Sequence, residues 1–206
     1  MTDYTEAIEQ LGSDNLEVRI GGVYALERIA LDSAEDYPIK ELTKFIREHS
    51  REPWLSAGPG AEVPEWAARR DVQAAFTVIV RRNAKGDILP LDLTGAVLDR
   101  AYLTGANFTG ADLTDAVLPR ANLTRAVLDR ADLTDANLTG ANLRGANLTG
   151  ANLRGADFAR ANLTDADLTE VKWPERVQVP KGWTVDSNSH RLKRADQLSE
   201  VMTYYL

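Results

Sequence analysis

The sequence predicts a mainly β solenoid that follows an α-helical segment and ends in a helical cap. The central observation is that an aliphatic or aromatic residue recurs at every fifth position over residues 93–168, in sixteen consecutive units. Apolar residues recur at helical spacing before this run, and again over residues 191–206 after it. Because internal repeats decide architecture before other signals do, the fivefold period carries the fold prediction.

Each five-residue unit is expected to form a short strand followed by a corner. Apolar residues spaced five apart do not line up on one face of an α-helix, and their spacing does not fit the two-residue alternation of a continuous strand. The first and third residues of a unit, Ala and Leu, point one way, and the residue between them points the other way. The last two residues turn the chain. Gly ends seven units and Arg ends five, which predicts that the corners do not all share one geometry.

Units such as ANLTG, ADLTD and ADFAR follow the pattern A(N/D)LXX, and in this they resemble the pentapeptide-repeat proteins. The resemblance implies a right-handed quadrilateral β-helix with four units per turn, in which Ala and Leu or Phe fill a narrow interior. Sixteen units then make about four coils, roughly 19 Å tall at an inter-strand spacing of about 4.8 Å. We assign residues 87–173 to this solenoid.

Residues 1–86 are expected to form a helical N-terminal segment. A helix over Leu16, Ile20, Val23, Leu26 and Ile29 follows Ser13, Asp14 and Asn15, which are N-cap residue types. A second helix is predicted to begin near Asp36, with Pro38 in its first turn and Ile39, Leu42, Phe45 and Ile46 facing inward. A third is predicted from Val72 to about Arg82. Similar segments precede pentapeptide repeats in larger proteins, so either the chain is a soluble member or an upstream part is missing before Met1.

Residues 174–206 are expected to cap the other end. Pro174 ends the repeat, residues 177–185 predict a short strand pair, and residues 191–206 predict a helix. Because a solenoid end exposes unpaired N–H and C=O groups, a cap at each end is the simpler interpretation. A homodimer formed through this helix is the alternative. The helix residues concerned are Leu192, Leu198, Met202 and Tyr205.

The composition indicates a soluble, cytoplasmic protein. Asp and Glu number 31 against 24 Lys and Arg, a net charge of −7, which disfavours direct binding of nucleic acid. The absence of cysteine excludes disulfides, thiol catalysis and cysteine-ligated metal. No apolar run is long enough to span a membrane, and acidic residues near Met1 exclude a signal peptide.

Sorting the units by a four-unit coil predicts charged columns on the solenoid. An acidic face should carry Asp92, Asp112, Asp115, Asp132 and Asp135, and the next corner should carry an Arg column. The Arg column comprises Arg100, Arg120 and Arg160. A solvated acidic face is the simplest interpretation. A docking surface and a weak Ca²⁺ or Mg²⁺ site are the alternatives, but we predict no metal, because carboxylates on a flat face converge poorly.

Four outward positions carry an apolar or aromatic residue where Asn or Asp is usual. They are Val97, Tyr102, Val117 and Val127, all in the first two coils. Contiguous exposed apolar residues usually mark a contact. We therefore expect the N-terminal helices to fold back over this patch, with a partner protein as the alternative.

The sequence favours a non-catalytic protein-interaction or scaffold module with an unidentified partner and no cofactor. His49 and His190 lie far apart, and no phosphate loop, metal-ligand cluster or nucleophile–base arrangement is apparent. The resemblance offers an alternative, because some pentapeptide-repeat proteins mimic B-form DNA, bind DNA gyrase or topoisomerase IV and protect it from quinolones. Seven Arg residues in a short solenoid count against this alternative, since they would repel a cationic DNA-binding surface.

Overall fold

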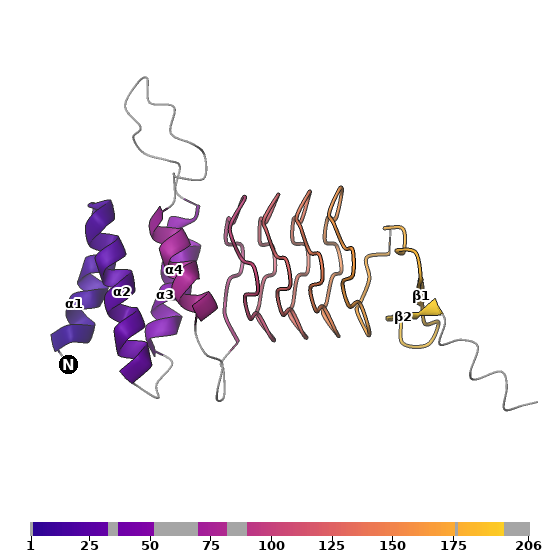
Figure 1. The fold of residues 1–206 in the computed structure, drawn as a ribbon, viewed down its shortest axis with the longest axis horizontal. Helices are drawn as coiled ribbons and strands as arrows, with labels where there is room; N and C mark the ends of the chain where they lie inside the picture. Colours follow the sequence, from indigo (N-terminus) through magenta and orange to yellow (C-terminus); the bar gives the residue numbers. More distant parts are fainter. Residues whose placement is uncertain (1, 33–36, 52–69, 82–89, 176, 196–206) are drawn as a thin grey trace, which may run out of the picture.

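The chain forms an elongated stack with helices at one end, coils in the middle and a small cap at the other end (Figure 1). This computed structural model describes residues 2–32, 37–51, 70–81, 90–175 and 177–195. The elements are α1 (Thr2–Leu11), α2 (Leu16–Asp32), α3 (Tyr37–His49), α4 (Arg70–Arg81), β1 (Trp183–Val185) and β2 (Leu192–Arg194). Among the described helices, none has both the length and the apolar character that a membrane crossing requires.

Helices α2, α3 and α4 confirm the helices expected from the sequence. Asn15 is the N-cap of α2, because its Oδ1 accepts hydrogen bonds from the amides of Glu17 and Val18 at 2.9 and 3.4 Å. Helix α1 was not predicted. It packs along α2, where Gly22 allows close contact, since a Cβ there would lie 2.9 Å from the Ala7 carbonyl oxygen.

The repeats form coils of four units. Every parallel bridge within the repeats joins residues 20 positions apart, such as Asp92 with Asp112 and Asn137 with Asp157. Taking one such position, the Val117 amide donates to the Ala96 carbonyl at 2.9 Å, and the Val117 carbonyl accepts from the Leu98 amide at 2.6 Å. Both bonds join Val117 to the preceding coil, and the adjacent Ala116 carbonyl and Leu118 amide pair with Asn137 of the next coil at 2.9 and 2.7 Å. An inner coil is therefore held by the coils before and after it, as in other solenoids.

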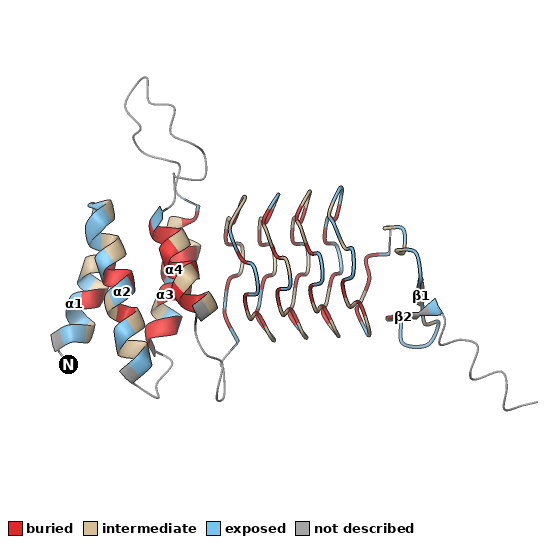
Figure 2. Cartoon of the chain, viewed as in Figure 1, coloured by how far each residue is buried: buried red, intermediate tan, exposed pale blue. Residues whose placement is uncertain are grey.

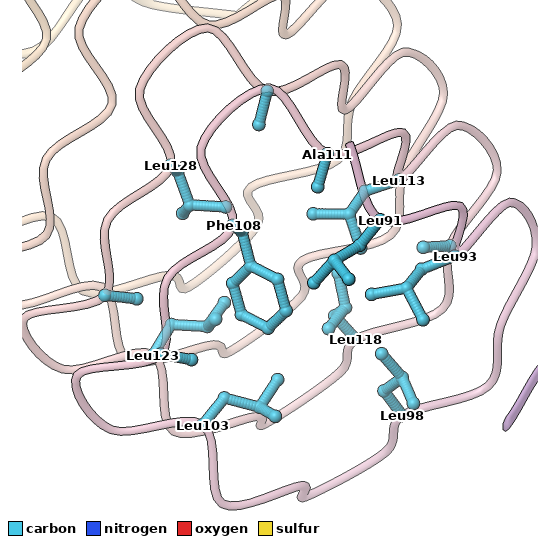
Figure 3. Close-up of a cluster of buried hydrophobic side chains, with 14 of the residues drawn as sticks. Leu91, Leu93, Leu98, Leu103, Phe108, Ala111, Leu113, Leu118, Leu123 and Leu128 are labelled. Carbon is cyan, nitrogen blue, oxygen red and sulfur yellow. The ribbon is translucent and has the colours of Figure 1, made fainter. Parts of the chain in front are cut away.

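The interior of the coils is filled by the Ala and Leu or Phe of each unit, as the sequence predicts. Leu93, Leu103 and Phe108 of the first coil point inward from different sides of the coil, and Leu113 and Leu123 repeat the arrangement in the next (Figure 3). This core continues without a break into the buried residues of the helices. Burial is concentrated within the coils and on α3 and α4 (Figure 2).

The corners share one backbone geometry, so the expectation that Arg and Gly corners differ is wrong. Arg100, Arg120 and Arg125 have φ of 56°, 57° and 56°, against 60° to 70° for the corner glycines. The corner residue occupies the third position of a turn closed, for example, by the hydrogen bond from the Ala101 amide to the Leu98 carbonyl. Pairing with the adjacent coils imposes this left-handed conformation on whichever residue stands there, at about 1–2 kcal/mol for a non-glycine residue.

Where the sequence predicts the beginning of a helix, at residues 192–194, the structure has a strand. Residues 192–194 form β2, which pairs antiparallel with β1, so the predicted strand pair within residues 177–185 is also wrong. The Leu192 amide donates to the Val171 carbonyl at 2.8 Å, and the Leu192 carbonyl accepts from the Glu170 amide at 2.9 Å. The strand forms because it satisfies open backbone groups at the end of the solenoid. Leu198, Met202 and Tyr205 lie outside the described residues.

Candidate interaction surfaces

The helices satisfy backbone groups that the first coil cannot pair with an earlier coil. The Val97 amide donates to Ser50 Oγ at 3.0 Å, and Ser50 is fully buried. Gln73 of α4 does the same for Tyr102: its Oε1 accepts from the Tyr102 amide at 3.2 Å and its Nε2 donates to the Tyr102 carbonyl at 3.3 Å. The side-chain amide of Gln73 thus provides both hydrogen bonds that a preceding coil would provide.

Two arginines complete this junction. Arg51 donates to the carbonyl oxygens of Thr94 and Gly95 at 3.0 and 2.8 Å. Arg47 of α3 forms an ion pair with Asp92, the first carboxylate of the acidic face. Asp92 therefore belongs to the junction between helix and solenoid, and only the rest of its column lies along the open side of the solenoid.

The helices cover the end of the solenoid and do not fold back along its sides, contrary to the expectation for the apolar patch (Figure 1). Val97 and Val117 stack as predicted, through a parallel bridge, and both are half-buried, as is Val127. The Tyr102 side chain stays 66% exposed although its backbone is held by Gln73. Amphipathic helices bury their apolar face equally well against an open coil end, and there they also satisfy the unpaired backbone groups.

Asn and Asp at the outward middle position have a structural role. Their Oδ1 accepts a hydrogen bond from the amide two residues later, as Asn107 does from Thr109 at 3.0 Å. On the acidic face, Asp92, Asp112 and Asp132 accept from the amides of their corner threonines at 3.2, 3.0 and 2.9 Å. Val117 needs no such acceptor, because the residue two positions later is Pro119, which has no amide hydrogen.

The column of Asp92, Asp112 and Asp132 is thus ordered by hydrogen bonds to its own corners. Asp112, Asp115 and Asp135 are exposed. Partial burial acts to raise the pKa of Asp132, but hydrogen bonds from Thr134 and Asn152 and the charge of Lys172 outweigh it, and the net effect is to lower that pKa. Among the described residues no three His, Cys, Asp or Glu side chains converge as a metal site would require.

The Arg column lies where the sequence places it, on the corner that follows the unit of Val97. Arg100, Arg120 and Arg160 all have positive φ. Arg120 Nη2 contacts both carboxylate oxygens of Asp99 at 3.0 and 2.9 Å. Arg160 is exposed at the last coil.

A second corner of the coils also carries arginines, and the sequence did not predict it. Arg125 and Arg144 lie on the next corner around the coil, where they line an open groove of about 550 Å³ with Thr104, Thr124, Gly145 and Asp165. Arg144 forms an ion pair with Asp165 at 3.5 Å. The two arginines occupy different positions in their units, fifth and fourth, so a search for one repeated column does not find them.

The two histidines lie at opposite ends of the molecule. His49 ends α3, stacks on Phe45 with ring centroids 4.1 Å apart, and its Nδ1 lies 3.1 Å from the Phe45 carbonyl oxygen. His190 lies in an exposed turn just before β2, a region whose nearby Asp186 has its pKa held well below the usual range by Lys193 and by the amides of Ser189 and Asn188. The structure does not bring the histidines together.

The coils of four five-residue units define a β-solenoid. The family model described as "Pentapeptide repeats (8 copies)" matches residues 91–118, 106–145 and 136–172. The chain belongs to the pentapeptide-repeat family. Among curated proteins no significant match was found.

Solved structures of pentapeptide repeat proteins are similar to this chain over the repeats. Rfr23 of the cyanobacterium Cyanothece 51142 is 40% identical, over 41% of this chain and 60% of its own, with a TM-score of 0.24. A protein of the Arabidopsis thaliana thylakoid lumen is 35% identical, over 41% and 66%, with a TM-score of 0.27. A protein of Nostoc PCC 7120 is 36% identical, over 42% and 77%, with a TM-score of 0.24. The chain spans less than two thirds of the first two relatives.

Proposed function

We propose that this chain is a non-catalytic protein-interaction module. In this proposal residues 87–173 form a right-handed quadrilateral β-helix that presents the binding surface, residues 1–86 form a helical domain that caps it, and residues 174–206 close the other end. The observation that carries the proposal is the sided charge of the solenoid. Five of the seven repeat arginines flank one face, and the five Asp of the acidic face lie two units away around the coil.

Such a surface is suited to recognition because its backbone is already committed to the coil. Val117, for example, is held by two backbone hydrogen bonds to the preceding coil, and its neighbours Ala116 and Leu118 are bonded to the next coil, so little order remains to be gained on binding. Complementary charges then select the partner and its orientation more than they add affinity.

The test is affinity capture from native lysate with the full chain as bait. The matched control bait carries Asp112→Asn, Asp135→Asn, Arg120→Gln and Arg125→Gln, which remove two charges from each charged surface while leaving every repeat unit in place. We expect a partner that the native chain captures and the neutral chain does not. Equal capture by both baits would contradict the proposal.

A DNA-mimicking gyrase or topoisomerase IV binder is the second candidate, and the ladder of Asp112, Asp132, Asp115 and Asp135 is the feature that favours it. QnrB1, a plasmid-mediated fluoroquinolone resistance protein, is 22% identical over 40% of this chain with a TM-score of 0.21, a likeness too low to support a shared function. Supercoiling by gyrase, with and without a fluoroquinolone, decides the matter. If micromolar protein neither inhibits gyrase nor protects it from the fluoroquinolone, this candidate is eliminated.

A further inference from the structure

One face of the solenoid is flanked by arginines on both of its corners. Its middle column is Tyr102, Asn122, Asn142 and Asn162, joined in sequence by parallel bridges. We call this column and its two corners the arginine-flanked face. The corner before it carries Arg100, Arg120 and Arg160, and the corner after it carries Arg125 and Arg144. Only two acidic residues, Asp99 and Asp165, share these corners, so the face is cationic within a chain of net charge −7.

The arginines here are held by rigid backbone. Arg120 and Arg125, in the second coil, have a φ fixed by their corners. The stem of Arg125 lies across the next coil, where a Cβ built on Gly145 would stand 3.6 Å from Arg125 Cγ. Within the described part of the chain, neither Arg125 nor Arg160 has a carboxylate within ion-pair distance. Their guanidinium groups therefore remain available to an incoming acid, in the geometry that suits carboxylates.

The middle of the face offers uncharged contacts. The amides of Asn142 and Asn162 are already linked, with Asn162 Nδ2 donating to Asn142 Oδ1 at 3.3 Å, so the column is ordered. Tyr102, 66% exposed, provides an aromatic ring at the end nearest the helices. The groove lined by Arg125 and Arg144 runs along one border.

We propose that the arginine-flanked face binds an extended acidic segment of a partner protein. This inference rests on the interaction role proposed above and specifies the partner's chemistry. A solenoid of roughly 19 Å accommodates about six extended residues at about 3.3 Å each, which fits a short linear segment. The negative charge on the rest of the chain repels an acidic segment and so directs it to this face.

The experiment measures binding of a fluorescein-labelled peptide of about eight Glu and Asp residues with one central Leu to the full chain, by fluorescence anisotropy at low salt. The test variant is Arg120→Glu with Arg125→Glu. The matched control is Arg130→Glu with Arg154→Glu, the same charge change on the corners that border the acidic face. Arg130 shares the backbone and stem geometry of Arg125, since its φ is 55° and its stem lies 3.3 Å from a Cβ built on Gly150, but it differs in forming an ion pair with Asp129 at 2.9 Å.

We expect the test variant to bind at least about tenfold more weakly and the control to stay within about twofold, with affinity falling as salt rises. Equal loss in both variants, or no binding by the native chain, overturns the proposal. Tighter binding of a single-stranded oligonucleotide than of the peptide, or self-association of the native chain that the peptide cannot displace, also overturns it. Circular dichroism spectra of all variants show whether each is folded. If the peptide fails while the lysate experiment still distinguishes native from neutral bait, this inference falls and the interaction role stands.

Discussion

The side chain of Arg120 lies over Gly140, the residue at the same corner one coil later. A Cβ built on Gly140 would stand 3.5 Å from Arg120 Cγ, and Gly140 has a φ of 67°. The same relationship joins Arg125 with Gly145 and Arg130 with Gly150. An arginine stem thus packs along the solenoid where the next corner has no side chain, while its own backbone adopts the conformation that glycine favours.

Replacing Arg125 by Gly should stabilise the chain. The substitution relieves a left-handed backbone at φ 56°, and we expect the free energy of unfolding to rise by about 1 kcal/mol in urea titration. Arg120→Gly is the control, since it also removes the ion pair with Asp99, worth roughly 0–1 kcal/mol, and should gain less. A loss of stability in Arg125→Gly would show that its stem packing outweighs the backbone strain.

Leu138→Ala should destabilise the solenoid by about 2–5 kcal/mol, because Leu138 is fully buried in the third coil. Leu163 occupies the same place in its unit but is only half-buried in the last coil, so Leu163→Ala should cost clearly less. Thermal unfolding of both variants checks this. Equal losses would mean that Leu163 is covered as completely as Leu138.

Removing the hydroxyl of Ser50 should weaken the junction between the helices and the first coil. In Ser50→Ala the Val97 amide loses its acceptor, at about 1–3 kcal/mol for a buried group. Hydrogen exchange at Val97 should accelerate, while Val117, whose amide donates to Ala96, keeps its protection. Ser189→Ala, in the exposed turn at the far end, is the control. Unchanged exchange at Val97 would mean that Ser50 does not hold this edge.

Gly22→Ala should separate α1 from α2. Alanine favours a helix over glycine by about 1 kcal/mol, but at Gly22 its Cβ meets backbone atoms of α1 at 2.9–3.0 Å. Gly21→Ala is the matched control, because its nearest atom is a flexible Gln10 oxygen at 3.7 Å, and it should stabilise. Unfolding free energies that rise in both variants would contradict the close contact of these helices.

Asp132 should make stability depend on pH in the acid range. Its pKa lies below the ordinary 3.8 in the folded chain, so its ionised form stabilises the fold above about pH 3.8 and this contribution is lost as pH falls through the folded pKa. In Asp132→Asn the contribution of the ionised carboxylate is absent at every pH. The difference in unfolding free energy between the two chains should therefore be smaller at pH 2 than at pH 7. NMR titration of Asp132 measures the pKa directly, and a midpoint above 3.8 would contradict the assignment of its hydrogen bonds.

Much of the solenoid could be predicted from residues alone. The fivefold period identified the inward Ala and Leu, and a four-unit coil correctly stacked Val97 on Val117 and Asp112 on Asp132. These predictions succeed because each coil contacts only its neighbours, so local pattern and tertiary contact are nearly the same information. The second arginine corner was missed because Arg125 and Arg144 do not occupy one repeated position.

The sequence by itself determined the repeat, the interior and the order of side chains around each coil, since a strict period leaves one arrangement of apolar residues. Only the tertiary structure decided what happens at the two ends and at the corners. Through Gln73 and Ser50 the helices cap open backbone groups of the first coil. Leu192 lies in a strand that pairs with open backbone groups at the other end, and Arg120 adopts the left-handed conformation at its corner. In each case a backbone hydrogen bond made with a distant segment outweighed the local preference of the residue.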